Sequence, residues 1–246
     1  MAFFTIISII SLGLALLSAV IVLFHVSRHS QPMVIMNVVW PLTALWSGLA
    51  GLWCYFSFGK TSKGMAKQMD MPEDDMSAMD MPDMNMSGNM KSMDMEPTGF
   101  RQKVMLSTFH CGAGCTLADI FGESFGHRVL EAAGLSGIGW NWGLDYLLAL
   151  IIGAFFQYAA IRPMMKQQSV PKVFIKAFRI DFLSLTVWQI GMYLFTSFIF
   201  FVVLPQPLVC NDWRFWFVMQ LAMCAGFILA YPMNGYLIRK GIKPAM

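Results

Sequence analysis

Long runs of apolar residues constrain this chain more than any other feature. A helix crosses a bilayer with about 20 mostly apolar residues, and six runs reach or approach that length. They cover about residues 2–24, 33–58, 104–139, 140–161, 180–204 and 215–238. Charged residues make up only 13% of the chain, whereas a soluble domain carries about a quarter. The sequence therefore predicts an all-α fold, a polytopic transmembrane bundle of about six spanning helices with the lipid bilayer as its partner.

The distribution of basic residues predicts the orientation of this bundle. The connection after the fourth run is strongly basic and holds Arg162, Lys166, Lys172, Lys176 and Arg179. Short basic loops stay in the cytoplasm, and the C-terminus is basic as well. Counting six spans back along the chain then predicts that both termini are cytoplasmic, in an inner (plasma) membrane.

Residues 59–103 differ in composition from everything around them. They hold half of the 22 methionines, interleaved with acidic residues, and Met-Asp-Met-Pro occurs twice. The segment shows no helical or strand periodicity, so we predict a disordered loop between two N-terminal transmembrane helices (1–58) and a four-helix domain (104–246). Counting spans predicts a cytoplasmic loop if the third run crosses the membrane, and an external loop if that run is re-entrant. The lysines and arginines that flank the loop favour the cytoplasmic side.

The methionines of this loop predict binding of a soft metal ion. Thioethers suit Cu(I), and a polar loop offers no core for methionine to fill. Copper(I), or silver, is therefore the candidate cofactor; the alternative is a drifted linker whose methionines arose by repeat expansion. The candidate ligands are Met69, Met71, Met79, Met81, Met84, Met86, Met93 and Met95.

The third apolar run carries a stripe of polar residues that predicts an intramembrane site. Residues four apart share one helix face, and stepping by four from Cys111 meets four further metal-ligating or acidic side chains. With the neighbouring histidine, the candidate metal ligands are His110, Cys111, Cys115, Asp119, Glu123 and His127. His110 lies about 100° round the helix from Cys111, so it joins only if Gly112 and Gly114 loosen the turn. Alternatively, the cysteines pack as small buried residues and the polar groups bind neighbouring helices.

The same run is expected to lie at the centre of the bundle. Its charged side chains are too costly to face lipid and should face the bundle interior or a cavity. Gly122 and Gly126 form a Gly-x-x-x-Gly pair, which lets a second helix approach closely.

The motif His110-Cys111-Gly112-Ala113-Gly114-Cys115 resembles a family of bacterial membrane proteins labelled domain of unknown function 4396. The likeness covers about residues 107–246. Three further stretches carry it: Ile161-Arg162-Pro163, Asp181-Phe182-Leu183-Ser184 and Tyr231-Pro232-Met233-Asn234. The resemblance implies a bacterial membrane protein and supplies no activity. Other members carry an acid in the fifth segment where this chain has Gln189, so a role for an acid there does not carry over.

Three functions are compatible with these patterns. The first is soft-metal handling, as copper or silver transport, sensing or storage, by the methionine loop and the His-Cys-x-x-x-Cys site. The second is a membrane thiol redox protein using Cys111 and Cys115, although two cysteines four apart on a helix are near the limit of disulfide geometry. The third is a non-catalytic structural or partner-binding subunit. The sequence contains no phosphate-binding loop, Ser-His-Asp arrangement or nucleic-acid patch, which favours a protein that is not an enzyme and binds no nucleic acid.

Overall fold

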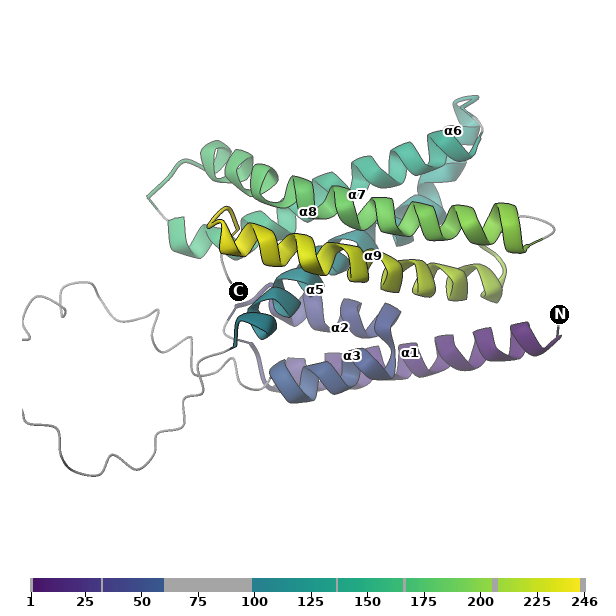
Figure 1. Ribbon diagram of the computed structural model, residues 1–246, viewed down its shortest axis with the longest axis horizontal. Coiled ribbons are helices and arrows are strands. Elements are labelled where there is room, and N and C mark those ends of the chain that lie inside the picture. Colours follow the sequence, from purple (N-terminus) through teal and green to yellow (C-terminus); the bar gives the residue numbers. More distant parts are fainter. Residues whose placement is uncertain are drawn as a thin grey trace, which may run out of the picture.

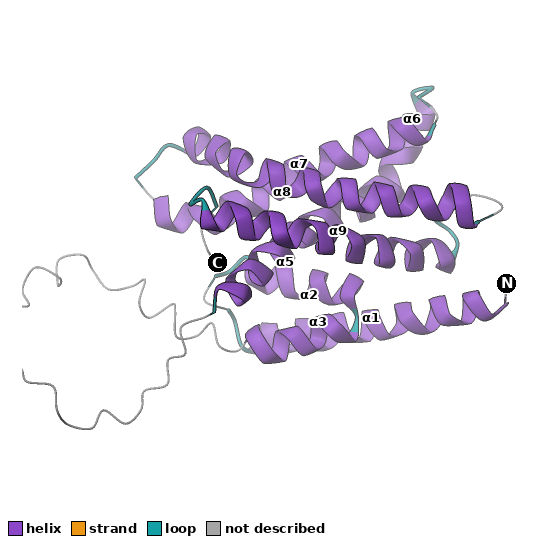
Figure 2. Cartoon of the chain, viewed as in Figure 1, coloured by secondary structure: helices purple, strands orange, loops and turns teal. Residues whose placement is uncertain are grey.

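The computed structural model describes residues 2–31, 33–59, 99–135, 137–165, 167–204 and 208–243. Over these residues the protein is a helical bundle (Figures 1 and 2). Its helices are α1 (Ala2–Arg28), α2 (Met36–Ser47), α3 (Leu49–Cys54), α5 (Phe100–Phe121), α6 (His127–Ala132), α7 (Ile138–Ile161), α8 (Val170–Phe198) and α9 (Trp213–Arg239). The candidate methionine ligands lie outside the described residues.

Five stretches are long and apolar enough to cross a membrane, close to the six that the sequence predicts. They are Phe3–Arg28, Phe100–Ala132, Ile138–Ile161, Val170–Val203 and Trp213–Arg239. Two of them continue through a π-helical turn, η4 (Gly122–Gly126) after α5 and η6 (Ile199–Val203) after α8. The all-α membrane architecture is therefore confirmed.

The helix α5 is the central element, as its charges predict. Of its most apolar stretch, 78% is buried inside the bundle, against 28% for α1. It lies between α1 to α3 on one side and α7 and α8 on the other (Figure 1). The prediction that Gly122 and Gly126 admit a neighbour is also confirmed, because a Cβ at either position would meet Asp145 or Leu144 of α7.

The second apolar run is a helical hairpin and not the single spanning helix that its length predicts. The helix α2 continues through Pro41 and ends at Ser47, and Gly48 takes a φ of +57° that reverses the chain. α3 and its π-helical extension η1 (Tyr55–Gly59) then return alongside α2. Tyr55 in consequence contacts the end of α1, where its hydroxyl lies 2.7 Å from His25 Nδ1. The hairpin enters the bundle and leaves it at the same end.

The tip of this hairpin is held by polar groups of two spanning helices. Gln220 Nε2 of α9 donates a hydrogen bond to the Leu45 carbonyl (3.1 Å), and Ser11 Oγ of α1 donates to Gln220 Oε1 (3.0 Å). Irregular backbone at membrane depth is tolerated only where protein groups or a cavity satisfy it. Gln220 therefore links α1 and α9 to the tip of the hairpin.

The hairpin changes the arrangement of the chain ends. The N- and C-termini lie at opposite ends of the bundle (Figure 1), whereas the sequence predicts that both lie on one side of the membrane. The end that holds the C-terminus is strongly basic. Its helix termini carry Arg28, Arg101, Lys103, Arg162, Lys172, Lys176, Arg239 and Lys240.

Candidate functional site: two polar clusters along α5 and its continuation

The predicted polar stripe is present, but its two ends belong to two separate clusters of side chains. Cys111 and Glu123 are 12 residues apart, which on a helix is about 18 Å. Each end of the stripe meets side chains from a different part of the fold. The partners of both ends come from other helices or from the tail after α9.

The first cluster, here the tail cluster, surrounds Cys111 and consists of Cys111, Asp181, Ser184, Asn234 and Lys243. Cys111 Sγ lies 3.1 Å from Asp181 Oδ1, 3.1 Å from Ser184 Oγ and 3.0 Å from Lys243 Nζ. Ser184 Oγ donates to Asn234 Oδ1 at 3.0 Å. Every member is at most 1% exposed, so α5, α8, α9 and the tail after α9 meet here in one buried network.

The charge in this cluster comes from an ion pair between the tail and α8. Lys243 Nζ donates to Asp181 Oδ1 at 2.7 Å. Burial lowers the pKa of Lys243, but the charge of Asp181 and hydrogen bonds to Asp181 and Cys111 outweigh it, so the pKa lies above its usual value. The lysine is therefore charged at neutral pH. Asp181 Oδ2 is buried and has no hydrogen-bond partner among the described residues.

The other two residues of the motif point elsewhere. His110 is fully buried against α7, its ring centroid 5.8 Å from that of Phe156. Cys115 lies one turn beyond Cys111, buried and with a free thiol. His110 and Cys111 thus face different helices, and the joint site that needs a loosened turn is not formed.

The turn is not loosened because Gly112 and Gly114 allow neighbouring helices to pack closely against α5. The helix α5 is regular through both of them. A Cβ on Gly112 would lie 2.5 Å from the Trp188 ring, and one on Gly114 would lie 3.1 Å from Gly153 Cα. Gly112 therefore makes room for a tryptophan of α8, and Gly114 lets α7 approach.

The second cluster, here the carboxylate–histidine cluster, consists of Glu123, His127 and Asp145. His127 Nδ1 lies 3.2 Å from Glu123 Oε2, and His127 Nε2 lies 3.4 Å from Asp145 Oδ2. One ligand atom from each residue falls within 4.8 Å of the others, an arrangement that could hold a metal ion. Among the described residues it is the one such group of three.

Local backbone structure positions this cluster. Glu123 lies in the π-helical turn η4 and His127 begins α6; such turns occur frequently at functional sites. Asp145 reaches across from α7 because Gly122 has no Cβ to block its carboxylate. Asp145 Oδ1 is buried without a hydrogen-bond partner in the described structure. A cavity of about 20 Å³ adjoins Asp119, Glu123 and Asp145, enough for about one water molecule or ion.

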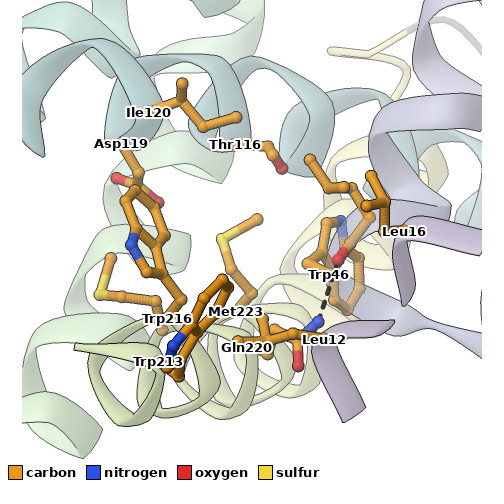
Figure 3. A pocket seen from close by; sticks show the side chains of 12 residues that line it. Leu12, Leu16, Trp46, Thr116, Asp119, Ile120, Trp213, Trp216, Gln220 and Met223 are labelled. Carbon is orange, nitrogen blue, oxygen red and sulfur yellow. Dashed lines mark hydrogen bonds between the residues drawn. The ribbon is translucent and has the colours of Figure 1, made fainter. Parts of the chain in front are cut away.

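Asp119 lines both this cavity and a larger one. A pocket of about 250 Å³ lies between α1, α2, α5 and α9, and Asp119 belongs to the walls of both cavities. Figure 3 shows Asp119 and Trp216 on one side of the hollow and Leu16 and Trp46 on the other. The walls are almost entirely apolar apart from Asp119, Thr116 and Gln220. Asp119 thus lies between an apolar hollow and the carboxylate–histidine cluster.

Sequence reasoning missed most of the partners in both clusters. Asp145, Asp181, Ser184, Asn234 and Lys243 were not among the candidate ligands. A signal existed for three of them, because Asp181, Ser184 and Asn234 lie in the stretches that carry the family resemblance. Lys243 carries no such signal, because it is one of several basic residues that follow the last apolar run.

Comparison with known proteins identifies the family. The model of the family described as "Domain of unknown function (DUF4396)" matches residues 101–243, so the chain belongs to this family. The match covers α5 to the tail lysine and leaves out α1 and the hairpin of α2 and α3. No curated protein and no solved structure matches the chain.

Proposed function

We propose that this member of the DUF4396 family handles transition-metal ions inside a bacterial inner membrane, with the carboxylate–histidine cluster as the ion site. The observation that carries the proposal is the convergence of Glu123, His127 and Asp145 to within 4.8 Å beside an ion-sized cavity. Ionisable groups are costly within a membrane and generally serve a function there. The family name adds no activity to this argument.

The ligand set favours a divalent ion at this site. Imidazole suits Zn, Cu, Fe and Ni, and carboxylates suit harder ions such as Mn²⁺. The methionine loop offers thioethers instead, which suit Cu(I), so copper or silver collection is the role that we propose for residues 59–103. Transport, sensing and storage share this chemistry.

Charge gives the proposed orientation. The basic end of the bundle faces the cytoplasm by the positive-inside rule. Both flanks of the methionine loop, Gly59 and Gly99, lie at the end where α3 returns and α5 begins. We therefore propose a cytoplasmic loop and C-terminus, with the N-terminus outside.

Metal binding by the purified protein tests the proposal. With Co²⁺ as a spectroscopic probe, we expect about one ion per chain and visible absorption bands from a site with nitrogen and oxygen ligands. Glu123→Gln, His127→Ala and Asp145→Asn should each weaken Co²⁺ binding by at least about tenfold, since removing even an outer-shell partner of a metal ligand costs that much. The matched control is Glu131→Gln, an exposed acid on the same helical stretch. Equal Co²⁺ binding by all four variants would remove this site from consideration.

A substitution outside the ligand set gives an independent test. In Gly122→Ala the new Cβ would collide with Asp145 Oδ1, so the carboxylate must turn away from His127. We expect Co²⁺ affinity to fall by about tenfold with little loss of thermal stability, because the displaced atom is the end of a side chain. Gly143→Ala on α7 is the control, since its Cβ meets nothing within 4 Å. Unchanged affinity in Gly122→Ala would show that Asp145 is not a ligand.

A thiol redox function is the second candidate, favoured by the contact of Cys111 Sγ with the Lys243 ammonium at 3.0 Å. Neighbouring positive charge is what activates reactive cysteines. Against it, Cys111 is fully buried, and buried cysteines are generally inert. Peptide mass spectrometry after peroxide treatment tests it: this function requires a Cys111–Cys115 disulfide or a sulfenic acid on Cys111 at low peroxide concentrations.

A further inference from the structure

The short tail after α9 turns back into the bundle. The helix ends at Arg239, Gly241 takes a φ of +67°, and Lys243 N bonds to the Leu237 carbonyl at 3.3 Å. The turn directs the Lys243 side chain inward, where it is 0% exposed. Lysine is almost never fully buried unless it is paired, so the location of its partners decides what the tail does.

Those partners form a cation site that Lys243 fills incompletely. The ammonium contacts Asp181 Oδ1 at 2.7 Å and Cys111 Sγ at 3.0 Å. Asp181 Oδ2, buried in the same network, has no partner in the described part of the chain. The Cys111 sulfur also lies 3.1 Å from Ser184 Oγ. The pocket thus presents a carboxylate and a sulfur to a cation of single positive charge, and it offers more ligand atoms than the lysine uses.

The sulfur determines which free cation would suit this pocket. Thiolates select soft ions such as Cu(I), and Ag(I) has the same charge and similar softness. When such an ion binds, the Cys111 S–H bond breaks, a metal–sulfur bond forms and the proton leaves to water, with no change of oxidation state. The neutral metal thiolate then adds no net charge to the buried pocket.

The lysine opposes this reaction. An ammonium at 3.0 Å from the sulfur occupies one approach to it, and two positive charges at such a distance repel strongly away from bulk water. The site is accessible to a metal only after Lys243 has moved, and the tail turn at Gly241 is the place where it would move.

We propose that the tail cluster is a second ion site, specific for a soft monovalent metal ion, and that Lys243 is the built-in cation that closes it. This inference rests on the proposed function, because it adds a soft-ion site and its regulation to a metal-handling protein. It involves different residues and a different ion from the carboxylate–histidine cluster. The two proposals can therefore fail separately.

Silver binding by full-length variants in detergent tests this proposal. Ag(I) affinity is measured by competition with a soluble thiol ligand, and the occupancy of Cys111 by its protection from alkylation in peptide mass spectrometry. Lys243→Met should increase the Ag(I) affinity at Cys111 at least about tenfold, because the repulsion is removed. Lys240→Met is the matched control: Lys240 is an exposed lysine of the same turn, 5.9 Å from the Tyr236 ring, and its removal should change nothing.

Two double variants complete the test. Lys243→Met with Cys111→Ser should lose the gain, which separates this site from the methionine loop present in every variant. Lys243→Met with Asp181→Asn keeps the pocket neutral in case the single variant folds poorly, and it should also bind Ag(I) more tightly than the parent. The proposal is overturned if neither Lys243 variant protects Cys111 better than the parent, or if the gain survives Cys111→Ser. Co²⁺ binding at the other cluster is expected to be the same in all of them.

Discussion

Lys243→Met is expected to reduce the free energy of unfolding by about 3–5 kcal/mol, because it removes one partner of a buried ion pair and leaves the other charged. Lys243 and Asp181 are at most 1% exposed, so water cannot replace the lost ammonium. Methionine has a similar length, which limits any loss from packing. The pKa of Lys243 lies above its unfolded-state value, so this stabilisation is present at neutral pH and is lost as the pH rises through the folded-state pKa of the lysine.

Unfolding in detergent, followed by heat or denaturant, measures this loss. Lys240→Met should leave the transition within about 0.5 kcal/mol of the parent, as for most surface substitutions. Adding Asp181→Asn to Lys243→Met should restore much of the stability, because the pocket no longer holds an unpaired charge. A loss below about 1 kcal/mol in Lys243→Met would mean that the tail pair is open to water, contrary to its burial.

The sequence predicts the membrane class well, because helices that lie in lipid consist mostly of apolar residues. Its error concerns residues 33–58, where a re-entrant hairpin and a spanning helix are equally apolar. The helix α2 passes through Pro41, and the chain reverses at Gly48. The side chain that binds the tip of the hairpin is Gln220, 175 residues away from Leu45. No local pattern around residue 48 could reveal that contact.

Only the part of the candidate site that lies along the α5 stretch could be predicted from the sequence. Helical spacing finds Cys111, Glu123 and His127 because α5, η4 and α6 follow one another as a continuous helical stretch. It cannot find the α7 carboxylate of Asp145 or the tail ammonium of Lys243, which meet α5 only through the tertiary fold. The spacing therefore predicted one continuous stripe, whereas the fold forms two clusters with different ligand chemistry.

Gly112→Ala is the substitution with the second large expected effect. Trp188 is fully buried, and its ring lies between Gly112 of α5 and Gly226 of α9, so that a Cβ on either glycine would come within 2.7 Å of the indole. A rigid ring held on both sides cannot move away, and overpacking of this kind costs about 1–3 kcal/mol. We expect a loss of that size in the same unfolding measurement.

The control for Gly112→Ala is Gly143→Ala, where the new Cβ meets nothing within 4 Å and alanine's higher helix propensity should slightly stabilise α7. A smaller ring should relieve the collision, so Gly112→Ala combined with Trp188→Phe is expected to lose less stability than the two single changes added together. If the losses add, the collision is not with Trp188. In that case the glycine of the His-Cys-Gly-Ala-Gly-Cys motif would need a reason other than the packing of α8, and the separation of His110 from Cys111 would lose its structural explanation.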